Sequence, residues 1–327
     1  MKKSKKLNES AKKEEKTSFT PTTDQKESSV PTQGNTITPP SKEQEKPEDK
    51  IKQLMDSADV YVFSGPMYYD RVDALRNVVF SKQKHKNRCI LFLTTFGGDA
   101  DSAYRLTAAL KEVYGKFDVV IAGLCKSAGT LTCIAADNLY FGRKGELGPL
   151  DIQMSRRKGD DQNEIISGLD IFLALEILIK QNATDAFIAF STQLQRTNRI
   201  SIKASMEIAS KMVAQIFAPI MDQINPLDLG EMHRSLSIAK GYVKVMLSDN
   251  FKSDLIDKLA THYPCHSFVI DKKQSKEFFN RVFDVDSSMS EIIRKYSSVL
   301  EFPHMQGVAT SLEALISSEE RLIKGKK

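Results

Sequence analysis

Two short segments of this chain combine small residues with groups that can take part in acyl transfer. The first is a pair of glycines, Gly97 and Gly98, which is separated from the preceding apolar run 88–93 by only three residues. Glycines at such a turn leave backbone N–H groups open to a ligand, because no Cβ atom stands in the way. The second segment holds Ser127 among small residues, in the sequence KSAGT at 126–130. A serine hydroxyl can act as a nucleophile, and N–H groups can stabilise the oxyanion that its attack creates.

Both segments are expected at the carboxyl edge of one parallel sheet. Three apolar runs have the composition of buried strands, and two amphipathic helical patterns lie between them, giving the order 59–65, 70–80, 88–93, 100–114 and 117–123. This β-α-β-α-β order predicts parallel strands with right-handed crossovers. Ligands of such sheets bind beyond the carboxyl ends of the strands. The glycine pair follows the second strand and Ser127 follows the third, so we expect the two at the same edge.

Each segment also has a purely structural interpretation. A strand, two glycines and a helix start can simply be a tight connection. The apolar sequence from Ser127 to Ala136 predicts a short helix, and a serine at the start of a helix is often an N-cap. These residues by themselves leave open whether the site is catalytic.

The composition is that of an ordinary globular protein. Hydrophobic residues make up 41% and charged residues 27% of the 327 positions, and the net charge is +5. This small charge gives no reason to expect nucleic acid as a partner. Four cysteines without a CxxC pair indicate reduced thiols in a cytoplasmic protein. No apolar run reaches about 18 residues and the basic N-terminus precedes no apolar region, so neither stable membrane insertion nor a signal peptide is expected.

Composition divides the chain into three parts. Residues 1–52 are polar and charged and cannot bury enough surface to offset the entropy cost of ordering, which predicts a disordered tail. Residues 53–285 form the predicted α/β domain, in which 155–250 is mainly helical after a polar loop at 155–162. The many apolar residues of this helical arm favour subunit packing in a homo-oligomer. Residues 286–327 are expected to form a helix and a polar tail.

Three motifs then occur in order, namely LTTFGG at 93–98, KSAGTL at 126–131 followed by AAD at 135–137, and GELGPLD at 145–151. Together they resemble the serine dehydrogenase proteinase family, which belongs to the Clp peptidase/crotonase fold group with signal peptide peptidase A as another relative. The segment YPCHSFVID at 263–271 is similar to a C-terminal motif of that family, which tends to have Gly where Ser267 stands. The similarity covers roughly 56–282, and the helical part is diverged.

The resemblance implies an α/β fold built as a Clp peptidase/crotonase-like spiral of ββα units. It also implies an ATP-independent serine endopeptidase that forms a homo-oligomer and acts on peptides or unfolded proteins. Ser127 would be the nucleophile. Backbone N–H groups of Gly97, Gly98 and Ala128, the residue after the nucleophile, would form the oxyanion hole.

The resemblance also leads to a hypothesis for the general base. Where the Clp peptidases have their catalytic His, this chain has Asp151, and where they have the triad Asp, it has His266. We therefore expect a triad of Ser127, His266 and Asp151 with the two supporting positions exchanged, since a triad is defined by geometry rather than chain order. The unperturbed pKa of histidine lies close to neutrality, which suits proton transfer from serine.

Several alternatives remain open at this stage. Lys126 could be the base, as could Lys158 or Lys180 from the following segment, although each would need burial to lower its pKa. His266 could be a structural residue. The fold could also serve a crotonase-type acyl-CoA enzyme or a non-catalytic scaffold. The sequence contains no metal-ligand cluster, phosphate loop or nucleotide fingerprint, so we expect no metal and no cofactor.

Overall fold

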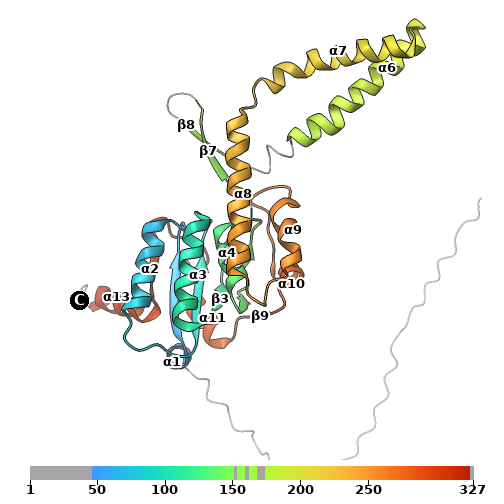
Figure 1. Ribbon diagram of the computed structural model, residues 1–327. Coiled ribbons are helices and arrows are strands. Elements are labelled where there is room, and N and C mark those ends of the chain that lie inside the picture. Colours follow the sequence, from blue (N-terminus) through green and yellow to red (C-terminus); the bar gives the residue numbers. More distant parts are fainter. Residues whose placement is uncertain (1–45, 151–152, 159–161, 168–173, 325–327) are drawn as a thin grey trace, which may run out of the picture. The chain divides into compact units, whose positions relative to one another are not determined.

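A six-stranded sheet forms the centre of the molecule in the computed structural model, which describes residues 46–150, 153–158, 162–167 and 174–324 (Figure 1). In spatial order its strands are β10 (Val308–Ser311), β1 (Asp59–Ser64), β2 (Cys89–Thr94), β3 (Asp118–Ile121), β5 (Asn138–Phe141) and β9 (Val282–Asp284). All are parallel except β10, which pairs antiparallel with β1 at one edge. The expected parallel sheet is therefore present, with β1, β2 and β3 in the predicted order.

Both faces of the sheet are covered, which explains why its central strands are apolar throughout. Residues such as Leu91 and Leu93 pack against helices α2 (Tyr69–Ser81), α3 (Ala100–Tyr114) and α4 (Ala128–Ala135). Their neighbours Ile90 and Phe92 belong to a second cluster on the opposite face. That cluster takes in α1 (Pro47–Ser57), α11 (Ser287–Lys295), α12 (Ser297–Leu300) and α13 (Leu312–Lys324). Successive residues thus alternate between two cores, as a strand requires.

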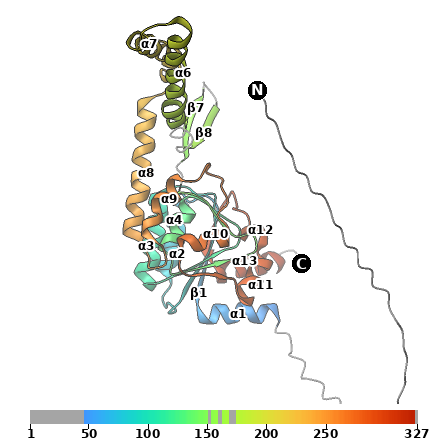
Figure 2. The ribbon, with the colours of Figure 1, turned by 90° about the vertical axis from the view of Figure 1, so that its right-hand side faces the viewer.

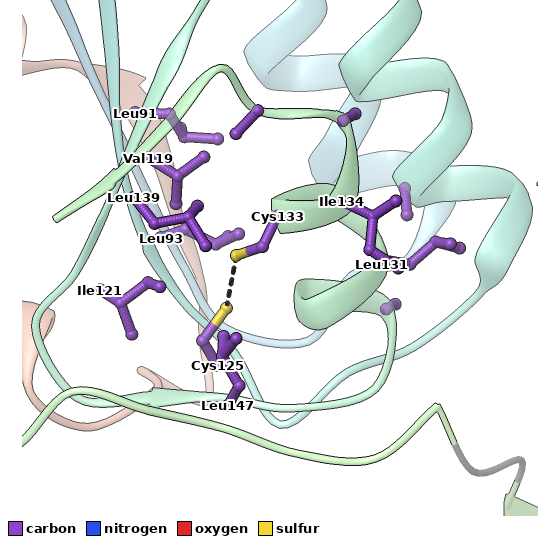
Figure 3. Packing of buried hydrophobic residues seen from close by; sticks show 14 of the residues in the cluster. Leu91, Leu93, Val119, Ile121, Cys125, Leu131, Cys133, Ile134, Leu139 and Leu147 are labelled. Atoms are coloured by element: carbon purple, nitrogen blue, oxygen red, sulfur yellow. Dashed lines mark hydrogen bonds between the residues drawn. The ribbon is translucent and has the colours of Figure 1, made fainter. Parts of the chain in front are cut away.

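A second sheet of two strands lies next to the first, and its first strand leads into the turn that begins α4. Its strands β4 (Leu124–Cys125) and β6 (Glu146–Leu147) are parallel. The succession β3–β4–α4 is a ββα unit, and β5–β6 begins the next one. Figure 3 shows Cys133 of α4 facing Cys125 of β4, with 3.8 Å between the sulfur atoms, among buried leucine and isoleucine side chains. The predicted α/β class with ββα units is confirmed.

The predicted helical arm is present, but a hairpin precedes it. The helices are η1 (Ile177–Ala183), α6 (Thr184–Asn198), α7 (Ile202–Met221) and α8 (Pro226–Met246). Helices α6 and α7 lie side by side, and Gln195 donates a hydrogen bond of 2.9 Å to Ser205 between them (Figure 2). The C-terminal half of α8 packs on α3 through the stacked rings of Tyr104 and Tyr242.

The prediction of a polar loop at 155–162 is wrong in part. Strands β7 (Gln153–Lys158) and β8 (Gln162–Ser167) pair antiparallel there. Segments of mostly polar residues lack the alternation of apolar and polar positions by which sequence analysis detects a strand. Residues 168–173 of the predicted helical part lie outside the described residues.

The two ends of the chain also differ from expectation. The predicted tail of 1–52 is wrong for its last residues, because α1 begins at Pro47 and buries Ile51 and Leu54. Residues 1–45 lie outside the described part. At the other end, the predicted helix and tail of 286–327 contain β10 as well, which extends the main sheet. Among the described helices, none combines the length and apolar character needed to cross a membrane.

The segment after α8 returns the chain to the small sheet. It contains η2 (Ser253–Leu255), α9 (Ile256–Thr261) and α10 (Lys272–Phe278). Asp271 and Gln274 form a capping box at the start of α10, which fixes where that helix begins. The loop between α9 and α10 carries His266 and pairs Ile270 antiparallel with Leu147 of β6.

Candidate active site

The glycine turn after β2 and the turn that carries Ser127 lie against each other. Thr95 forms a parallel bridge with Cys125, through N–H···O bonds of 2.7 Å to Leu124 and 3.0 Å from Lys126. A Cβ atom built on Gly97 would lie 2.8 Å from Cβ and 3.4 Å from Oγ of Ser127. Any larger residue at position 97 would therefore collide with the serine. The structure brings together these two sequence-predicted segments.

Ser127 has an unusual backbone conformation. Its φ is 48° and its ψ is −108°, and among the described non-glycine residues only Arg199 also has a positive φ. Such a conformation costs of order 1–3 kcal/mol and persists only where the surroundings impose it. Ser127 stands at the N-cap position of α4, as the structural interpretation expected, but its half-buried side chain makes no capping hydrogen bond to the helix. The strained turn presents the hydroxyl beside the glycine turn instead.

Two backbone N–H groups of the site are available to a ligand. The N–H of Gly97 donates to Oγ1 of Thr95 at 2.9 Å, so it is engaged within the turn. In the part of the chain that the structure describes, the N–H groups of Gly98 and Ala128 donate to no protein acceptor. Ala128 is the first residue of α4, where the helix dipole adds to the attraction for negative charge. At these two turns, the N–H groups of Gly98 and Ala128 are thus the ones left for a ligand.

A cleft of about 830 Å³ contains all of these groups. Ser127, Ala128 and the glycine pair lie in its wall together with His266. Its rim is rich in exposed apolar side chains, which are Tyr68, Tyr69, Phe96, Ile238 and Met305. A cleft of this size and lining can accept an extended peptide segment.

The cleft also contains charges that the sequence analysis did not select as site residues. Asp99, Asp101 and Arg105 line it at the start of α3, and the Arg105 guanidinium lies 4.8 Å from the centre of the Tyr69 ring. Burial and the nearby Asp101 carboxylate raise the pKa of Asp99. In sequence these residues looked like the ordinary polar first turns of a helix. Met305 lies outside all of the motifs, 34 residues after the last of them at 263–271, so no local signal pointed to it.

His266 reaches the cleft from the loop between α9 and α10, and its side chain is half-buried. The loop is held in place by two hydrogen bonds between Ile270 and Leu147, of 2.9 and 3.0 Å. Asp151 lies outside the described residues. The residue before it, Leu150, lines the cleft. The structure therefore brings His266 and Ser127 to one cleft, and the expected part of Asp151 stays a prediction.

The three lysines considered as bases differ in their surroundings. Lys126 is buried, and its Nζ contacts the carbonyl oxygens of Leu147 and Phe268, each at 3.1 Å. Lys180 lies on η1 with its side chain 72% exposed and forms an ion pair with Glu176. Lys180 is not among the residues that line the cleft with Ser127. The side chain of Lys158 is outside the described part.

No protein-family model matches this chain, and a search of curated proteins found no significant match. Similar solved structures include a serine-to-alanine mutant of the 1510-N membrane-bound stomatin-specific protease, with 14% identity and a TM-score of 0.29 over 46% of this chain and 69% of that one. A lysine-to-alanine mutant of that protease in complex with a substrate peptide has 17% identity and a TM-score of 0.29, over 39% of this chain and 62% of that one. An asparagine-to-aspartate mutant of ClpP1 from Listeria monocytogenes has 12% identity and a TM-score of 0.26, over 48% of this chain and 81% of that one. These values assign neither a family nor an activity to this chain.

Proposed function

We propose that this protein is a serine endopeptidase that works through an acyl-enzyme on Ser127. The observation that carries the proposal is the contact between Gly97 and the strained Ser127 turn, with the N–H groups of Gly98 and Ala128 available beside it. Acyl transfer needs a nucleophile and fixed donors aimed at the developing oxyanion. A single open cleft holds both.

In the proposed reaction, Oγ of Ser127 attacks the carbonyl carbon of a peptide bond while His266 takes the hydroxyl proton. The oxyanion receives hydrogen bonds from Gly98 and Ala128. His266 then gives its proton to the leaving amine, and the same residue activates the water that hydrolyses the acyl-enzyme. Asp151 would orient the imidazole and stabilise its protonated form. Gly97 contributes the space that lets the two turns approach.

The sequence motifs add the finer parts of the proposal. They support membership of the serine dehydrogenase proteinase family, hydrolysis without ATP, a homo-oligomer and a cytoplasmic location. The peptide or unfolded-protein substrate agrees with the open cleft and its apolar rim. The family, the ATP-independent hydrolysis, the homo-oligomer and the location rest on the motif resemblance. The substrate class rests on the resemblance and on the open cleft.

The experiment that tests the proposal is labelling with a fluorophosphonate, followed by mass spectrometry of the modified peptide. We expect one adduct, on Ser127, and its loss in Ser127→Ala. The matched control is Ser235→Ala, which removes another half-buried serine of the same cleft and should label like the unchanged protein. His266→Ala should slow labelling by about a thousandfold or more.

Two outcomes would contradict the peptidase assignment. Failure of the folded protein to react would leave the fold as a scaffold. Failure to react combined with protection against thermal unfolding by an acyl-CoA would favour a crotonase-type enzyme, in which the same two N–H groups hold a thioester oxygen.

A further inference from the structure

Lys126 directly precedes Ser127, and its ammonium group is fully occupied by acceptors. Nζ donates to the carbonyl oxygens of Leu147 and Phe268, each at 3.1 Å, and forms an ion pair of 2.8 Å with Glu146. Lys126 is 6% exposed. Buried lysines are rare unless they are paired in this way.

The three acceptors come from two different parts of the chain. Glu146 and Leu147 form β6, which pairs with β4 just before the Ser127 turn. Phe268 lies two residues after His266 on the loop between α9 and α10. One ammonium group therefore connects the backbone around Ser127 to the backbone around His266.

The side chain of Lys126 packs over Gly148, where a larger residue would collide with it. A Cβ atom built on Gly148 would lie 2.6 Å from Cδ of Lys126. The aliphatic part of the lysine thus crosses the chain just after β6, at a position that has no side chain. The antiparallel bridge between Leu147 and Ile270 lies beside the crossing and adds two backbone hydrogen bonds to the same junction.

A lysine ammonium has three N–H bonds and no acceptor. The three oxygens around Lys126 match these three N–H bonds, so each bond has an acceptor in the protein. A general base must instead present a lone pair to the proton that it removes. The contacts of Lys126 therefore argue against the role of base considered from the sequence.

We propose that Lys126 is a positioning residue, which fixes the loop that carries His266 against the turn that carries Ser127. The inference rests on the proposed function in that it concerns the same nucleophile and base. Misplacement of catalytic groups by about 1 Å can slow a reaction about a hundredfold. The residues on either side of His266 are the half-buried Cys265 and the exposed Ser267, and neither belongs to the buried core, so a fixed point is needed close to the histidine.

The test compares Lys126→Met with Lys144→Met. Lys144 also pairs with a glutamate, Glu301 at 2.7 Å, but its side chain is 68% exposed and lies outside the cleft lining. We measure the rate constant of fluorophosphonate labelling between pH 5 and pH 9. Lys126→Met should label about a hundredfold more slowly, while its curve of rate against pH keeps the inflection that a histidine base produces. Lys144→Met should keep both the rate and the curve of the unchanged protein. A fall to the level of Ser127→Ala with loss of the inflection would instead identify Lys126 as the base.

A second measurement follows the position of His266 without any reaction. The Cε1–H resonance of His266 is assigned among the five histidines by its loss in His266→Gln. Lys126→Met should shift and broaden this resonance, and Lys144→Met should not. If unchanged protein is not labelled at all, the proposed function fails, while the resonance still tests the connection between Lys126 and the loop.

A milder variant covers the case in which Lys126→Met does not fold. Glu146→Gln keeps the lysine and both carbonyl acceptors and removes only the carboxylate charge. It should shift the His266 resonance in the same direction and slow labelling about tenfold, which is less than the loss expected from misplacement by about 1 Å. A wild-type labelling rate and an unmoved His266 resonance in a folded variant of Lys126 or Glu146 would overturn the proposal.

Discussion

At Gly97 the requirement for glycine comes from both conformation and space. Its φ is +113°, and a Cβ atom would lie 2.8 Å from Cβ of Ser127. Gly115 offers a comparison, because its φ is +71° but nothing lies within 4 Å of a Cβ atom built there. The first glycine is therefore needed for the approach of two turns, and the second only for the end of α3.

This difference predicts distinct effects of two alanine substitutions. Gly97→Ala should slow fluorophosphonate labelling at least about a hundredfold, because it displaces Ser127. Gly115→Ala should keep the labelling rate and lose roughly 1 kcal/mol of stability, the cost of a positive φ for alanine. Labelling rates and thermal unfolding of both variants check the prediction. Equal labelling of the two variants would show that the close approach is not needed.

Asp59 holds a polar network at the opposite, amino-terminal end of β1. The buried carboxylate forms an ion pair of 2.9 Å with Lys82 and accepts hydrogen bonds from the hydroxyl of Tyr114 and the N–H of Lys86. Burial alone would raise the pKa of Asp59, but these hydrogen bonds and the Lys82 charge outweigh it and lower the pKa below its ordinary range. His85 also contacts this network, with 3.1 Å between Nδ1 and the hydroxyl of Tyr114.

The lowered pKa of Asp59 predicts the sign of a pH effect on folding. Its stabilisation is present above the unfolded pKa and is lost as the pH falls through the lower folded pKa. Asp59→Asn should be less stable at pH 7 by about 2 kcal/mol, the value of hydrogen bonds to a charged group. The difference from unchanged protein should shrink progressively as the pH falls from about 5 towards about 1, because a carboxylate of lowered pKa becomes protonated only below its ordinary range. Urea unfolding of both proteins across this pH range checks the prediction. A stability difference that does not change with pH would contradict the lowered pKa of Asp59.

The connection from α12 to β10 is the element that completes the carboxyl edge of the sheet. Ser64 at the end of β1 donates to the carbonyl of Val299, and Thr94 at the end of β2 donates to that of Leu300, each at 2.5 Å. A Cβ atom on Gly123 would lie 1.9 Å from the carbonyl oxygen of Glu301. This close packing brings Phe302 against Phe96 on the cleft rim, with 5.1 Å between the ring centres.

We expect Thr94→Val to loosen this connection. The substitution leaves the buried carbonyl of Leu300 without its side-chain donor, which costs about 1–3 kcal/mol. The control is Thr107→Val, since the hydroxyl of Thr107 bonds to Tyr104 inside α3, where that carbonyl keeps its helical partner. Thr94→Val should unfold at a lower temperature and be cleaved faster within 301–307. Thr107→Val should show neither change. Matching unfolding curves would argue against a stabilising role of the connection.

At the scale of the whole molecule, the helical arm carries exposed apolar side chains that a single copy leaves uncovered. On α7 these include Ile202, Met206, Ile216 and Ile220. Water-exposed apolar patches of this kind are typical of surfaces that bind protein. The family resemblance makes a second copy of this chain the expected partner.

This predicts a solution mass of at least twice the 36.7 kDa of one chain. Replacing Ile216 and Ile220 by glutamate should lower the mass, because charges would have to be buried in the contact. Lys211→Glu, an exposed position on the same helix, should leave the mass unchanged. Light scattering after size exclusion measures all three, and a monomeric unchanged protein would refute the prediction.

The sequence by itself determined the order β-α-β-α-β, the parallel sheet and the edge at which Gly98 and Ser127 lie. It could do so because apolar runs and helical periods are local signals, and because crossover connections have one hand. Ser127 and the glycine pair could be selected for the same reason, since turn residues stand directly after the strands that position them. The hairpin of β7 and β8 was not predicted, because its residues are mostly polar and show no alternation of apolar and polar positions.

Only the tertiary structure decided which side chains meet at that edge. Gly97 N–H is engaged by Thr95, which leaves Gly98 and Ala128 as the donors. Lys126 reaches Phe268 and β10 joins β1 through contacts between residues far apart in the chain. Such contacts depend on how whole elements pack, and packing at a distance produces no periodic pattern in the residues on either side.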